Sequence, residues 1–215
     1  MKSSLEILHT AETIQASPEN PLKYFSVLAA GLLSAVFFSM LFYGEKFLFW
    51  KYPLSALGAY HTPNGVSNTV SMLIYGAGFI FCSVVFLKAA AYYRRNDSVP
   101  FRNAKLKLCY MISAGFFLGI APHDVIWVLH TIGNGIMTGM LWILIMIYLY
   151  QAFYPEQKPV YYMNMILLQV FLLPYAFLFA IDSDYRDIAQ KFAFFGVFGI
   201  LLIAAGAVSR QKNAG

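Results

Sequence analysis

The segment that decides the fold is residues 121–135, which read Ala-Pro-His-Asp-Val-Ile-Trp-Val-Leu-His-Thr-Ile-Gly-Asn-Gly. It lies between two long apolar runs and holds two of the four histidines, His123 and His130, together with the acid Asp124. Ionisable groups beside hydrocarbon usually pair with one another, face a protein interior or reach water. The sequence therefore predicts a membrane-embedded helical bundle arranged around this polar edge.

The composition indicates that lipid is the solvent of most of the chain. The 215 residues are 60% hydrophobic and 12% charged, whereas soluble domains carry about 25% charged residues. The net charge of +5 fits basic cytosolic loops better than a nucleic-acid interface, because no nucleic-acid-binding motif accompanies it. Cys82 and Cys109 lie inside apolar runs, so neither a disulfide framework nor a cysteine metal site is predicted.

Six apolar runs divide the chain, and a membrane helix needs about 20 mainly apolar residues. We predict an all-α, polytopic membrane protein with a six-transmembrane-helix bundle over residues 22–208. A cytosolic segment over residues 1–21, which does not resemble a cleaved signal peptide, precedes the bundle, and a cytosolic tail over 209–215 follows it. The predicted spans are residues 22–42, 69–92, 106–121, 125–150, 161–181 and 189–208, of which the third is short.

The distribution of basic residues predicts the orientation in the cell membrane. With the N-terminus inside, eleven Lys and Arg residues fall on the cytosolic side and four on the outer side. Basic residues concentrate on the cytosolic side of membrane proteins, so both termini are expected there. The loop 43–68, the edge around His123 and the acidic loop 182–187 then share the outer face. The aromatic-rich loop 43–68 is expected to fold over the mouth of the bundle.

The outer face would gather the residues that could carry chemistry. His123 and His130 are seven residues apart, so on one helix they would share a face. With His61 from the first loop they could hold a metal such as zinc, and Asp124 or Asp182 could act as a base. Ser55 is a candidate nucleophile without the surrounding motif of a nucleophile elbow. The alternative is that these histidines only make hydrogen bonds within the bundle or lie at its interface with the membrane.

The loop between the second and third spans is strongly basic. It could bind anionic lipid headgroups, or it could serve only to hold this loop in the cytosol. The candidate headgroup ligands are Arg94, Arg95, Arg102, Lys105 and Lys107.

Two short motifs resemble a known family pattern. One is Pro53-Leu-Ser-Ala-Leu-Gly58 after the first span, and the other is Gly119-Ile-Ala-Pro122 followed by His130-Thr-Ile-Gly133. Together they are similar to the DRAM-like six-helix membrane proteins and their uncharacterised prokaryotic relatives. The resemblance implies a six-helix bundle, an outward loop holding Pro-x-Ser and a helix-borne histidine. Ala56 stands where an acid is expected after the serine of that pattern.

Three functions follow from these observations. The first is an integral membrane protein whose outward polar pocket binds lipid, or a membrane-protein partner, without catalysis. The second is an intramembrane metal-dependent lipid hydrolase that uses His61, His123 and His130 as zinc ligands. A small transporter is third, because paired broken helices are not evident in the sequence.

Overall fold

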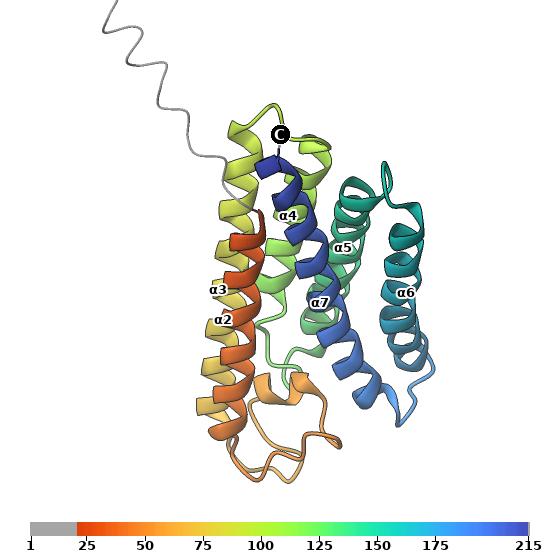
Figure 1. Cartoon of the computed structure of the whole chain (residues 1–215). Helices are drawn as coiled ribbons and strands as arrows, with labels where there is room; N and C mark the ends of the chain where they lie inside the picture. Colours follow the sequence, from red (N-terminus) through yellow and green to blue (C-terminus); the bar gives the residue numbers. More distant parts are fainter. Residues whose placement is uncertain (1–20, 215) are drawn as a thin grey trace, which may run out of the picture.

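The computed structural model describes residues 21–214, and these form an all-helical bundle (Figure 1). The predicted N-terminal segment falls outside the described residues, apart from Pro21 at the start of the first helix. One short 3-10 helix, η1, lies between the first two long helices. The elements are α2 (Pro21–Leu41), η1 (Leu54–Gly58), α3 (Thr69–Arg95), α4 (Arg102–Leu118), α5 (Trp127–Phe153), α6 (Lys158–Ala180) and α7 (Arg186–Ala214).

Five of the long helices, α2, α3, α5, α6 and α7, are long and apolar enough to cross a membrane. These five helices indicate a multi-pass membrane protein, which confirms the predicted class. The remaining helix, α4, has 17 residues and carries Arg102, Lys105 and Lys107 in its first turns. At 1.5 Å per residue it is about 26 Å long, shorter than the hydrocarbon layer. It packs between α3 and α5, its neighbours in the chain.

The helices run up and down, so that alternate connections meet at the same end of the bundle (Figure 1). The start of α2 lies beside the end of α7, where the backbone N–H of Leu22 donates to Ser209 Oγ at 3.4 Å. The segments 42–68, 119–126 and 181–185 meet at the opposite end. The prediction that the His-bearing loops and the acidic loop share one end is therefore confirmed. The last helix continues beyond Val208 as far as Ala214, so the predicted tail is helical up to that residue.

Glycine brings α4 and α5 into backbone contact. A Cβ atom at Gly115 would lie 2.6 Å from Met137 N, and one at Gly133 would lie 2.8 Å from the carbonyl carbon of Leu118. Small residues at such positions let membrane helices approach closely. By contrast, a Cβ atom at Gly139, which is on α5 like Gly133, would meet no atom within 4 Å.

We expect Gly133→Ala to lower the stability of the bundle by roughly 1–3 kcal/mol, because the new methyl group would collide with the backbone of α4. The matched substitution Gly139→Ala should leave stability unchanged or raise it by up to about 1 kcal/mol, since alanine favours helix. Thermal unfolding of the two variants in the same detergent measures the difference. Equal melting temperatures would show that α4 and α5 do not touch at Gly133.

Candidate functional site

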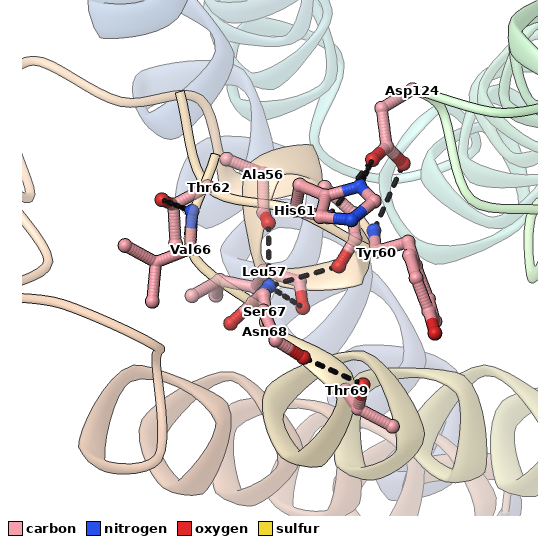
Figure 2. A network of polar contacts seen from close by, with 11 residues as sticks. Ala56, Leu57, Tyr60, His61, Thr62, Val66, Ser67, Asn68, Thr69 and Asp124 are labelled. Carbon is pink, nitrogen blue, oxygen red and sulfur yellow. Dashed lines mark hydrogen bonds and ion pairs between the residues drawn. The ribbon is translucent and has the colours of Figure 1, made fainter. Parts of the chain in front are cut away.

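The long first loop is folded around the side chain of Asn68, which is 1% exposed. Its Oδ1 accepts the backbone N–H of Gly44 at 3.1 Å. Its Nδ2 donates to the carbonyl oxygens of Ala56 at 3.2 Å and Ala59 at 2.9 Å (Figure 2). One amide thus ties together the start of the loop, the helix η1 and the start of α3. Buried backbone groups need such partners, so Asn68 makes an ordered loop possible here.

A tight turn completes the loop. The backbone N–H of Thr62 donates to Val66 O at 2.8 Å, and Gly65 supplies the positive φ of +81° that the turn requires. His61 and Ser67 form an isolated antiparallel bridge on either side of this turn. The turn presents His61 toward the segment 119–126.

Asp124 joins this loop to the segment before α5. Its two carboxylate oxygens accept the backbone N–H groups of Tyr60 and His61, each at 2.9 Å. The His61 ring nitrogen Nδ1 lies 3.5 Å from the same carboxylate (Figure 2). Partial burial by itself would raise the pKa of Asp124, but the backbone donors and His123 together lower the pKa below its ordinary value of 3.8. Asp124 therefore stays ionised at neutral pH and acts as a clamp between two segments 63 residues apart.

His123 and His130 approach one another, with ring centroids 5.9 Å apart. Contrary to the sequence prediction, they do not share a helix, because Pro122 lies in a turn and α5 begins only at Trp127. His130 is buried and its Nδ1 lies 2.9 Å from the carbonyl oxygen of Ala121. His123 Nδ1 is also buried, and no partner for it is found within the described residues. Burial lowers the pKa of His123 against the opposing effect of Asp124.

The three histidines do not form the predicted zinc site. Within residues 21–214 no group of three or more His, Cys, Asp or Glu side chains is close enough to hold one metal ion. His61 turns toward Asp124, whereas His123 faces His130. Asp182 pairs instead with Arg186 on the first turn of α7.

A cavity of about 460 Å³ lies next to this edge, inside the bundle. Two residues that carried the sequence hypotheses, Ser55 and His130, line it. Most of its wall is apolar and comes from α5, α6 and α7. Besides His130, its neutral polar side chains are Ser55 from η1, Tyr75 from α3, Thr131, Asn134, Thr138 and Trp142 from α5, Tyr175 from α6 and Gln190 from α7.

Two residues at the start of α7 hold η1 against this cavity, and the sequence did not reveal them. Gln190 Oε1 accepts the backbone N–H of Leu54 at 2.7 Å. The buried Lys191 donates from Nζ to the carbonyl oxygens of Tyr52 at 2.8 Å and Asp187 at 2.7 Å. The sequence offered one sign of this contact, because Lys191 lies near the start of an apolar span. The count of basic residues assigns it only to the outer side.

The basic segment at the other end of the bundle does not act as one surface. Arg94, Arg95 and Lys107 are exposed, which leaves them open to headgroups. Arg102 caps α3, since its Nε donates to Tyr93 O at 2.7 Å. Lys105 is 1% exposed, bonds to Gln151 Oε1 and lies 4.3 Å from the centre of the Tyr148 ring. Lys105 is thus an internal residue and cannot be the predicted surface ligand.

Comparisons of the chain with protein-family models, with curated proteins and with solved structures gave no match. The fold and the site therefore define the class by themselves. The chain is a multi-pass helical membrane protein with an internal, mainly apolar cavity at one end, closed on one side by an ordered loop.

We expect Asp124→Asn to release the first loop, because an amide cannot accept both backbone N–H bonds. The loss should be about 1–2 kcal/mol, since bonds to a charged acceptor are worth more than neutral ones but this carboxylate is partly reached by water. Hydrogen exchange at the amides of Tyr60 and His61 should accelerate. The same substitution at the exposed Asp184 is the control and should leave this exchange unchanged.

The clamp should also depend on pH. Because the pKa of Asp124 is lower in the folded chain than its ordinary value of 3.8, its stabilisation is complete above that value and is lost as the pH falls through the folded pKa. Exchange at Tyr60 and His61 should therefore be slow at pH 5 and above and, after correction for intrinsic rates, should rise below about pH 4. A pH-independent corrected rate would argue against the clamp.

Proposed function

We propose that this protein is a six-helix integral membrane protein of the cell membrane that binds a lipid in its outer-end cavity, without catalysis. The cavity carries the proposal. A volume of about 460 Å³ falls within the range of about 300–1,000 Å³ that is usual for small-molecule sites. Its wall is mainly apolar with a few polar groups, as the binding of an amphipathic molecule requires.

The position of the opening favours a lipid over a water-soluble ligand. The lining residues that are also exposed are Gly135 on α5 and Leu173, Ala176 and Phe179 on α6. The cavity therefore opens through the side of the bundle between α5 and α6, and both helices are apolar enough to span a membrane. A molecule that enters there comes from the bilayer.

Three of the side chains that the hydrolase hypothesis needs are engaged in holding the fold. Asp124 binds two backbone N–H groups, Asp182 pairs with Arg186, and His130 is bonded to the Ala121 carbonyl. These contacts support a binding role for the cavity over the metal-dependent hydrolase.

The proposed orientation places both termini in the cytosol and the cavity at the outer end. The excess of Lys and Arg at the end that holds the 94–107 segment supports this orientation. The proposed relationship to DRAM-like proteins is supported by one coincidence: Ser55 and His130, which carry the resemblance, both line the cavity.

Filling the cavity tests the proposed function. Gly139 lines it, and open space lies where its side chain would begin, so Gly139→Leu should occupy the cavity without disturbing the helices. We expect the variant to lose at least about tenfold in affinity for a photoreactive single-chain lipid, measured by saturable cross-linking in detergent. The same change at Gly199, which is exposed on α7 and also has open space, is the control. Equal labelling of both variants, or labelling that never saturates, would refute lipid binding in this cavity.

The orientation has its own test. Asn64 and Ser98 are exposed in turns at opposite ends of the bundle, whereas the native Cys82 and Cys109 are buried. In intact cells a membrane-impermeant maleimide should label Asn64→Cys but not Ser98→Cys. The reverse pattern would place the cavity on the cytosolic side.

A further inference from the structure

The cavity lining lacks ionised side chains. Within the described residues no Asp, Glu, Lys or Arg lines it. Lys191 follows the lining residue Gln190 in the chain, but its ammonium group donates to the carbonyl oxygens of Tyr52 and Asp187. A headgroup in the cavity would thus meet neutral donors and acceptors only.

These neutral groups form a polar wall on α5. Thr131, Asn134 and Thr138 follow the spacing of one helix face, and they span about 10 Å along the axis. Asn134 Nδ2 donates to His130 O at 2.9 Å, which leaves its Oδ1 as an acceptor. The hydroxyls of Thr131, Thr138 and Ser55 make no hydrogen bond to any described residue. The wall therefore offers both donors and acceptors to a ligand.

This lining discriminates between headgroups by charge. An anionic phosphate or carboxylate would lose its hydration without gaining a cation, and burying an unpaired charge is strongly unfavourable. A hydroxyl or an ester carbonyl would exchange hydrogen bonds to water for hydrogen bonds to the threonines and the asparagine, which is nearly neutral in free energy. The apolar walls of α6 and α7 would then take up the hydrocarbon chain.

We propose that the cavity selects neutral, hydroxyl-bearing lipids of the monoacylglycerol or long-chain alcohol class over anionic lipids. This inference rests on the proposed function, since it names the kind of lipid that the same cavity binds. The polar wall of α5 holds the headgroup, and the opening between α5 and α6 admits the lipid from the bilayer.

The test uses the unaltered full-length protein in detergent and three oleoyl probes that differ only in the headgroup. Monooleoylglycerol, oleoyl lysophosphatidic acid and oleoyl lysophosphatidylcholine compete for the photoreactive lipid. We expect monooleoylglycerol to compete at least about tenfold better than the anionic probe, because the anion would be desolvated without a partner. If the three compete equally while Gly139→Leu still weakens the labelling as expected, the headgroup selection is wrong and lipid binding stands. If none competes, lipid binding and the inference both fail.

Removing two hydroxyl groups from α5 tests where the lipid headgroup binds. Thr131→Val combined with Thr138→Val keeps the side-chain shape but removes both hydroxyls. We expect it to weaken the binding of monooleoylglycerol severalfold while the melting temperature stays close to that of the unaltered protein, because neither hydroxyl bonds to a described residue. Unchanged competition by monooleoylglycerol in the double variant would overturn the assignment of the headgroup to the α5 wall.

Discussion

The two backbone hydrogen bonds that Asp124 accepts from Tyr60 and His61 hold the outer end of the bundle together. Asn68, Gln190 and Lys191 hold the first part of the 42–68 segment, up to Ala59, but none of them binds its later part to the segment before α5. The two bonds to Asp124 tie the loop to the segment that leads into α5 and therefore to His130 at the cavity. A carboxylate is suited to this task because its two oxygens accept two neighbouring N–H groups at once. Asn68 performs the complementary task inside the loop, where an amide both donates and accepts.

Contacts on both sides fix the position of η1. Leu54 and Leu57 of η1 are buried, and Ser55 faces the cavity. On its other side, Gln190 and Lys191 bind the backbone at Leu54 and Tyr52. The cavity is thus closed at its outer end by a segment that α7 holds on one side and Asp124, in the segment before α5, holds on the other. Its only exposed lining residues among those described lie on α5 and α6, so the walls direct entry to the side of the bundle.

The sequence predicted the helices well because hydrophobic length is a local property. All six expected spans correspond to helices, and three loops group at one end because successive helices run in opposite directions. The contacts of the site were less predictable, since Asp124 and His61 are 63 residues apart and no local pattern couples them. A proline can open a helix, but the carbonyl oxygen of Pro122 accepts two N–H bonds in a turn, and α5 starts only after this turn. The zinc hypothesis needed His61 to join His123 and His130, but His61 turns toward Asp124 while the other two rings face each other.

The two buried lysines show how this bundle treats charge within apolar surroundings. Lys105 at one end is held by the Gln151 amide and the Tyr148 ring, and Lys191 at the other end by two carbonyl oxygens. Among the described residues, the hydrogen-bond acceptors of both ammonium groups are neutral oxygens. Both lysines lie close to helix ends, where long side chains can keep a charge near the interface. Neither lysine lines the cavity between these ends. The polar residues of the cavity wall on α5, Thr131, Asn134 and Thr138, are neutral, which a membrane interior tolerates. The same requirement that keeps charge out of the protein's centre also determines which molecules can enter it.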